Sequence, residues 1–146
     1  MISHDTVRVT TLVDADPETA FRVFTDEIDI WWKRGARYRS RNGTMCLDGE
    51  YLREADESIG RITAWEPGKR LSLELFTWSF HPGERTEVEV RFEPAPTGTR
   101  VTIEHRGWQR RPSGEAEFRT TVGLWWGTLL PALKNAVYRS NSRAHR

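Results

Sequence analysis

The sequence TEVEVRFEPAPTGTRVTIEHR, at positions 86–106, alternates apolar and polar residues on both sides of a turn. Val88 and Val90 share one face of its first half. Ile103 and His105 share one face of its second half. A period of two is typical of antiparallel strands with one buried and one solvated face. The linking PAPTG segment combines prolines, which cannot donate to a ladder, with a glycine that permits a tight bend. The stretch therefore predicts a β-hairpin.

A long apolar helix is expected after this hairpin, beginning near Ser113, which can cap it. Its apolar residues recur at spacings of three and four over about five turns, the pattern of a helix with one buried face. They are Phe118, Val122, Trp125 or Trp126, Leu129, Leu133 and Val137. Pro131 lies inside this pattern and predicts a kink rather than an end. A helix laid across a curved sheet can enclose a cavity, so we expect a binding site there.

The first half of the chain contributes further strands and two short helices. Asp16 and Pro17 form a strong helix start, because aspartate caps the first turn and proline fits the first helical position. The expected strands are Thr6–Asp14, Met45–Glu54, Ile59–Glu66 and Arg70–Phe80, and the second short helix is Asp26–Trp32. The order is strand, two helices, about five strands and a long helix. It predicts an α+β fold with an antiparallel sheet.

The composition sets limits on the class of protein. A chain of 146 residues is expected to form one domain, 1–146, with 139–146 as a disordered basic tail. The single Cys46 gives no internal disulfide, and neither a signal peptide nor a membrane-spanning apolar run is recognisable. We therefore expect a cytoplasmic protein that does not insert into membranes. A net charge of +1 gives no overall attraction to nucleic acid.

The order of the elements, together with short sequence segments in each of them, resembles the START-like superfamily, also called the SRPBCC group. Within it, the resemblance is closest to the group related to the C-terminal domain of the heat-shock chaperone ATPase activator. Five segments carry it: DPETAFRVFT (16–25), Trp31-Trp32, GRITAWEP (60–67) with Arg70-Leu71, the hairpin 87–108, and Gly123–Leu129. The resemblance implies a helix-grip fold, in which a curved antiparallel sheet wraps around a long C-terminal helix. Members of the superfamily include lipid and hormone binders, aromatic-polyketide cyclases and chaperone co-factors.

Three functions are consistent with these observations. The first is binding of a small apolar or aromatic ligand, neutral or anionic, between the sheet and the C-terminal helix. The second is an enzyme of the cyclase or hydrolase type that uses His105 to transfer a proton. The third is a chaperone co-factor or stress-response interaction module. The candidate ligand-binding residues are Trp31, Trp32, Tyr51, Leu73, Leu75, Val90, Ile103, His105, Val122, Trp125 and Trp126. Exposed sheet edges would also allow a homodimer.

His105 and the tryptophans each have a structural and a functional interpretation. His105 follows the phase of the apolar residues, so burial should lower its pKa and leave a neutral ring. Such a ring serves either as a satisfied core group or as a partner for a ligand. The seven tryptophans fit a core, but indole N–H groups seek partners, and two or three of them are expected to line a pocket. Trp125 and Trp126 are about 100° apart on a helix, so only one of them should face the sheet.

The segment KRGARYRSR, at positions 33–41, is either a solvated loop or a basic rim. If the segment is extended, Arg37, Arg39 and Arg41 lie on one side and could select a ligand with an anionic head. The sequence has no Cys-x-x-Cys, His-Glu-x-x-His, phosphate loop or Gly-x-Ser-x-Gly motif. We therefore expect neither a metal nor a cofactor.

Overall fold

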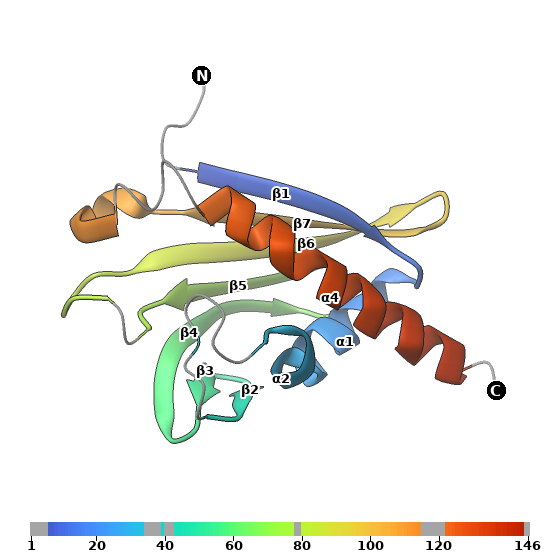
Figure 1. The fold of residues 1–146 in the computed structure, drawn as a ribbon, viewed down its shortest axis with the longest axis horizontal. Coiled ribbons are helices and arrows are strands. Elements are labelled where there is room, and N and C mark those ends of the chain that lie inside the picture. The colour runs from blue at the N-terminus through green and yellow to red at the C-terminus, as the bar shows by residue number, and fades with distance from the viewer. Residues whose placement is uncertain (1–5, 34–38, 40–42, 78–79, 115–121, 145–146) are drawn as a thin grey trace.

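The computed structural model describes residues 6–33, 39, 43–77, 80–114 and 122–144 (Figure 1). Its strands are β1 (Thr6–Val13), β2 (Met45–Leu47), β3 (Tyr51–Glu54), β4 (Glu57–Glu66), β5 (Arg70–Leu75), β6 (Thr86–Ala95) and β7 (Gly98–Arg106). Its α-helices are α1 (Pro17–Asp26), α2 (Ile28–Trp31) and α4 (Val122–Ala144), and two 3-10 turns cover Trp108–Arg110 and Pro112–Gly114. None of these helices is both long and apolar enough to cross a membrane.

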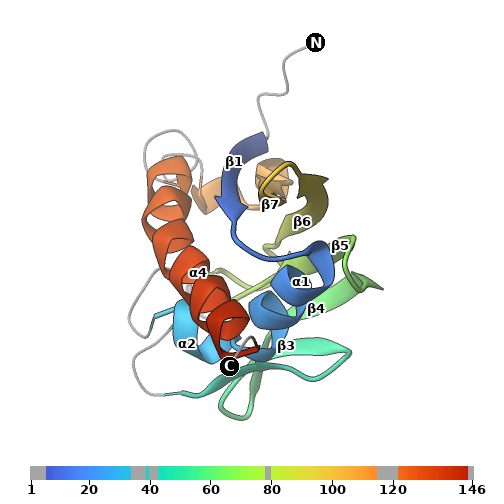
Figure 2. The same cartoon turned by 90° about the vertical axis from the view of Figure 1, so that its right-hand side faces the viewer.

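The seven strands form one antiparallel sheet in the order β1-β7-β6-β5-β4-β3-β2. The sheet is curved and open, and α4 crosses its concave side, with α1 and α2 between α4 and the β2–β4 end (Figures 1 and 2). The pairing shifts register once between β3 and β4 and once between β4 and β5, and such irregularities help a sheet to bend. The predicted α+β helix-grip architecture is confirmed.

The hairpin of β6 and β7 forms as the alternation predicts. Val90 lies opposite Ile103, and Val88 lies opposite His105, so the apolar faces of both strands coincide. These four residues are buried, and the charged residues between them face the convex side. The helix start at Asp16 is also confirmed, because its carboxylate accepts a hydrogen bond from the N–H of Thr19 at 2.7 Å.

Two predicted strands are shorter in the structure. The predicted strand Met45–Glu54 is a hairpin, because the Asp48 carboxylate accepts the N–H groups of Glu50 at 3.0 Å and Tyr51 at 2.7 Å. These bonds fold residues 48–50 into a turn and divide the strand into β2 and β3. The strand expected to reach Phe80 ends at Leu75, and the N–H of Phe80 donates to the carbonyl of Thr77.

The C-terminal helix is described from Val122 to Ala144 and differs from its prediction at its C-terminal end. Ser113 lies in a 3-10 turn, where its hydroxyl donates to the Glu84 carboxylate at 2.7 Å. The predicted cap at Ser113 stays a prediction, because residues 115–121 lie outside the described part. At the other end, α4 continues to Ala144, so the disordered tail predicted from position 139 is wrong for 139–144. Pro131 lies inside this helix, as expected.

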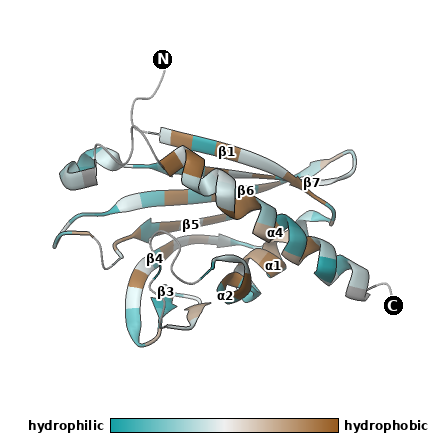
Figure 3. Cartoon of the chain, in the orientation of Figure 1, coloured by the Kyte–Doolittle hydropathy of each residue, from teal (hydrophilic) through white to brown (hydrophobic). Residues whose placement is uncertain are grey.

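The core lies between the concave face of the sheet and the three helices. Every strand contributes to it, and so does a stripe of α4 that runs from Val122 to Val137. Figure 3 shows the consequence on the ribbon: α4 alternates between hydrophobic and hydrophilic residues, and its C-terminal turns are the more hydrophilic. The N-terminal half of α4, which begins at Val122, is therefore the half positioned to form a site with the sheet.

Candidate functional site

Most of the predicted site residues meet in one layer between the sheet and the helices. Leu73, Leu75, Val90, Ile103 and His105 come from the concave face of β5, β6 and β7. Trp31 and Trp32 come from the end of α2, and Val122, Trp125 and Trp126 from the first turns of α4. All of these residues are buried except Trp125, which is half-buried.

His105 is fully enclosed at the centre of this layer. Its Nδ1 accepts the indole N–H of Trp126 at 3.2 Å, so Nε2 carries the proton and donates to the hydroxyl of Thr86 at 2.7 Å. Trp108 closes the other side, because its indole N–H donates to the His105 carbonyl at 3.2 Å and its ring centroid lies 4.6 Å from the imidazole. The histidine therefore ties β6, β7 and α4 together.

The environment of His105 fixes its charge. Burial removes the imidazole from water and, with the nearby Arg111 guanidinium, lowers the pKa of His105 from 6.5 to about 3. The ring is neutral at pH 7, and the predicted neutral, buried histidine is confirmed. Both ring nitrogens already form hydrogen bonds with protein groups. A proton transfer to a ligand would first require that the hydrogen bond with Thr86 or the one with Trp126 breaks.

An aromatic row runs from the core to the start of α4. We use this name for Phe24, Trp31, Trp32, Trp125 and Trp126. Neighbouring ring centroids are separated by 4.6 Å for Phe24 and Trp31, 5.8 Å for Trp31 and Trp32, and 5.6 Å for Trp32 and Trp125. Trp126 contacts both Trp32 and Trp125. As predicted, one member of the adjacent pair is buried and the other is not: Trp126 is 1% exposed, and the half-buried Trp125 packs against Trp32.

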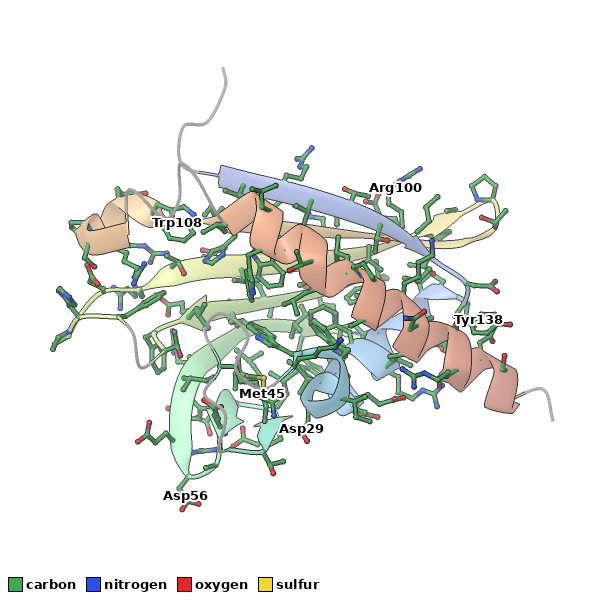
Figure 4. The ribbon with its side chains drawn as sticks, in the orientation of Figure 1. Asp29, Met45, Asp56, Arg100, Trp108 and Tyr138 are labelled. Atoms are coloured by element: carbon green, nitrogen blue, oxygen red, sulfur yellow. The ribbon has the colours of Figure 1, made fainter. Side chains whose placement is uncertain are left out.

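Arg39 does not form the predicted basic rim. Its side chain is buried, and its guanidinium is paired with the Asp29 carboxylate and donates to the carbonyls of Trp32 and Gly43. The same Asp29 oxygen accepts the N–H of Met45 at 2.9 Å, which places Asp29 and Met45 side by side (Figure 4). Arg39 therefore anchors to α2 and to the residues that precede β2. Arg37 and Arg41 lie outside the described part of the chain.

Tyr51 also lies away from the predicted site. Tyr51 lies opposite Arg61 on the neighbouring strand, and the Arg61 side chain reaches Glu74 on the convex face. The next residue, Leu52, points to the opposite face and is buried. The guanidinium of Arg53 lies over the Tyr51 ring at 5.1 Å. The face of β3 depends on its register with β4, and the sequence of β3 alone did not reveal it.

Sequence reasoning missed Thr86, Trp108 and Arg111. Thr86 could have been found, because it shares the strand phase of Val88 and Val90. Trp108 begins the short 3-10 turn that follows β7, and Arg111 comes directly after that turn, so no periodicity places either side chain. Arg111 is buried, and its guanidinium stacks on the ring of Phe80 at 4.0 Å.

Two of the surface hollows lie entirely within the described residues, and the predicted site residues line neither of these two. One of about 470 Å³ lies at the loop between β5 and β6, around Phe76 and His81. The other, of about 600 Å³, lies between β1 and α4. The enclosed cavity next to His105 stays a prediction. Within the described part, His, Cys, Asp and Glu side chains do not gather in groups of three or more that could hold a metal ion.

Comparisons with solved structures agree with this architecture. A Mesorhizobium loti protein is 23% identical, with a TM-score of 0.64, over 92% of this chain and 97% of its own. A Staphylococcus aureus protein is 14% identical, with a TM-score of 0.69, over 96% and 97%. CalU16 from Micromonospora echinospora is 19% identical, with a TM-score of 0.61, over 94% and 79%. Likenesses at these identities concern the fold alone.

A family model identifies the chain more directly. The model described as "Activator of Hsp90 ATPase homolog 1-like protein" matches residues 14–137. No curated protein matches the chain. The matched range includes α1, α2, strands β2 to β7 and most of α4. The chain belongs to this family, as the resemblance of its sequence implied.

Proposed function

We propose that this member of the activator-like family binds a small apolar or aromatic molecule between the sheet and the start of α4. The observation that carries the proposal is the aromatic row, which extends from Phe24 in the core to the half-buried Trp125. A core could be filled by smaller aliphatic residues, whereas a group of indoles offers large flat faces to a flat ligand. The ligand would contact the row at its half-buried end, next to Trp125 and Trp32.

Binding fits the chemistry of this region better than catalysis does. Nδ1 and Nε2 of His105 are each engaged by a protein partner within 3.2 Å. A general base needs a free nitrogen within hydrogen-bond reach of its substrate and a pKa nearer the working pH. His105 instead holds Trp126 in place, and through it the row. Its role in the proposed site is to position the indole.

The corrected position of Arg39 changes the expected ligand. A guanidinium that is paired with Asp29 and bonded to three backbone carbonyls is not available for an anionic head group. We therefore expect a neutral aromatic ligand to bind at least as well as an anionic one. Two fluorescent probes separate these cases: N-phenyl-1-naphthylamine is neutral, and 1-anilinonaphthalene-8-sulfonate has a similar ring system with a sulfonate.

The experiment titrates each probe into the full chain and follows its emission. The neutral probe should bind, and Trp125→Ala should weaken it about tenfold, because the substitution removes one face of the proposed site. Trp65→Ala is the matched control, since Trp65 is also partly exposed but packs on Phe21 at the distant β4 end. Equal affinities for Trp125→Ala and the parent chain would contradict the proposal, as would equal losses in the two variants.

A further inference from the structure

The strand β1 forms an open edge of the sheet. It is the first strand in the order, and among the described strands it pairs with β7 alone, over the register from Thr6 to Val13. In a strand paired on one side, every second residue directs its N–H and C=O away from the sheet. Proteins protect such edges with prolines, bulges or charges. The sequence TVRVTTLV has no proline, its pairing with β7 shows no register shift, and its one charged residue is Arg8.

The helix α4 runs alongside this edge. A Cβ added to Gly123 would lie 3.4 Å from a methyl group of Val7, and the Asn141 side chain donates to the Asp14 carbonyl at 2.9 Å, so the two elements follow one another from end to end. Between them lies a groove of about 600 Å³, lined by Val9, Thr10, Thr11, Gly127, Leu130, Pro131 and Lys134.

On the α4 side, the groove is lined by apolar residues with small or compact side chains at Gly127 and Pro131. Gly127 has no side chain, and a Cβ added there would meet nothing within 4 Å. Pro131, one turn later, is exposed and offers a compact ring with no N–H. Leu124, on the same side of the helix one turn before Gly127, is 75% exposed. An incoming backbone could therefore approach β1 closely while its side chains pack on the helix.

We propose that this groove binds an extended, acidic segment of another protein, which adds to the sheet as a strand beside β1. An edge supplies alternating donors and acceptors along its length, and only another extended backbone matches them all. The adjacent apolar wall would receive every second side chain of the added strand. The site is separate from the aromatic row and does not depend on the proposed ligand.

The charge of the groove argues for an acidic partner. Lys134 is the charged residue of the lining, and within the described part of the chain it makes no ion pair. On the convex side of the same edge, Arg8 is 68% exposed and pairs with Glu104 at 2.7 Å. Arg100 lies opposite Leu12 in the register of β1 and β7. Two copies of this chain paired symmetrically about Thr10 would bring both sets of these cations to one interface. An acidic segment complements them, whereas a second copy opposes them.

The test uses a fluorescein-labelled peptide of eight residues, the length of β1, with alternating valine and threonine and two aspartates. Its anisotropy is followed during titration with the full chain. A second peptide carries lysines in place of the aspartates. Two further peptides carry N-methyl groups at every second residue, one on the odd and one on the even positions. Strand addition buries only one of the two sets of N–H groups against β1.

The aspartate peptide should bind, and the lysine peptide should bind about tenfold more weakly. One N-methylated peptide should lose binding and the other should keep it. Gly127→Gln should weaken binding about tenfold by filling the groove, without disturbing the fold, because its side chain would enter open space. Lys134→Glu should favour the lysine peptide instead. Lys69→Glu, at an exposed turn between β4 and β5, is the matched control and should change nothing.

Three results of the peptide titrations would overturn the proposal. The first is that no peptide binds, and the second is that both N-methylated peptides bind alike. The third is that the affinity for the aspartate peptide is the same in Gly127→Gln as in the parent chain. Sedimentation of the parent chain tests the competing occupant, because a dimer that Gly127→Gln dissociates would assign the groove to a second copy and overturn the acidic partner.

Discussion

His105 carries two hydrogen bonds in the core, and their loss should be costly. In His105→Leu, the Thr86 hydroxyl and the Trp126 indole N–H would each lose a buried partner. A buried polar group left without a partner costs about 1–3 kcal/mol, so we expect a loss of about 2–4 kcal/mol in the free energy of unfolding. Urea unfolding followed by tryptophan fluorescence measures it.

His105→Gln provides the control, because its amide keeps one donor and one acceptor. It should cost less than His105→Leu and should preserve a hydrogen-bonded indole proton at Trp126 in NMR spectra. Equal losses in the two variants would show that packing volume, and not hydrogen bonding, accounts for the effect.

Arg39 should be the most consequential arginine of the described chain. Arg39→Ala would leave the Asp29 carboxylate without its cation. It would also leave the buried Glu54 carboxylate, which lies 3.9 Å from Nε of Arg39, next to the cavity that the removed side chain had filled. Removing one partner of a buried ion pair typically costs about 3–5 kcal/mol. Arg39→Lys should recover part of this loss, since an ammonium cannot reproduce the planar fork. Arg91→Ala is the comparison at a 54% exposed arginine, where we expect less than about 1 kcal/mol. Similar losses at positions 39 and 91 would contradict the anchoring role.

At the scale of elements, two glycines should respond to alanine with opposite signs. Gly127 lies exposed in α4 with open space around its Cβ position, so Gly127→Ala should raise stability by about 0.5–1 kcal/mol through helix propensity. Gly98 begins β7 with φ +152°, and a Cβ there would lie 2.1 Å from the Val13 carbonyl oxygen. Gly98→Ala should therefore destabilise the β6–β7 turn by at least about 1–3 kcal/mol. Thermal unfolding of both variants measures the signs, and a shift in the same direction would refute this account.

The elements also show which features the sequence could predict. Strands β6 and β7 were predictable because Val88, Val90 and Ile103 repeat with the period of the strand itself. The β2–β3 hairpin was not, because the Asp48 side chain bonds to the backbone of the next residues and interrupts an otherwise suitable pattern. Periodicity describes the buried face of an element, whereas turns of this kind depend on single side chains.

Features that depend on several distant segments were less accessible from the sequence. Arg39 belongs to a run of charged and polar residues that are usually exposed. Its burial becomes favourable only because the fold brings Asp29 and Glu54 next to its guanidinium. His105 was predictable in burial and in charge, because its strand phase is local. Its partners Thr86 and Trp126 come from β6 and α4, and therefore from tertiary structure.

At the scale of the whole molecule, the two faces of the sheet use different chemistry. The concave face buries aromatic and aliphatic residues, whereas the convex face carries an ion-pair network centred on Glu89. Glu89 is 2% exposed and pairs with Arg70 at 2.9 Å, Arg106 at 3.1 Å and Arg91 at 3.3 Å. Although burial raises the pKa of Glu89, the bonds from Arg70 and Arg106 outweigh it, and the pKa lies below its usual 4.5. The network joins β5, β6 and β7 from the side opposite the core.

These two faces predict the stability of the molecule in acid. The folded pKa of His105 is about 3 against 6.5 when unfolded, so the unfolded chain binds this proton first and stability falls from pH 6.5 toward pH 3. The loss should be about 1 kcal/mol between pH 6 and pH 5, where carboxylates remain ionised. Glu89 acts in the same direction but at lower pH, because its contribution to stability is present above pH 4.5 and is lost below it.

The expected profile of stability against pH therefore falls in two stages. Urea unfolding at a series of pH values should show a flat profile between pH 6 and pH 5 for His105→Gln, with the lower stage retained. Glu89→Gln should keep the upper stage and lose only part of the lower one, because the pKa values of Asp48 and Glu84 are also lowered, to about 2. A His105→Gln profile as steep as that of the parent chain would assign the upper stage to another group.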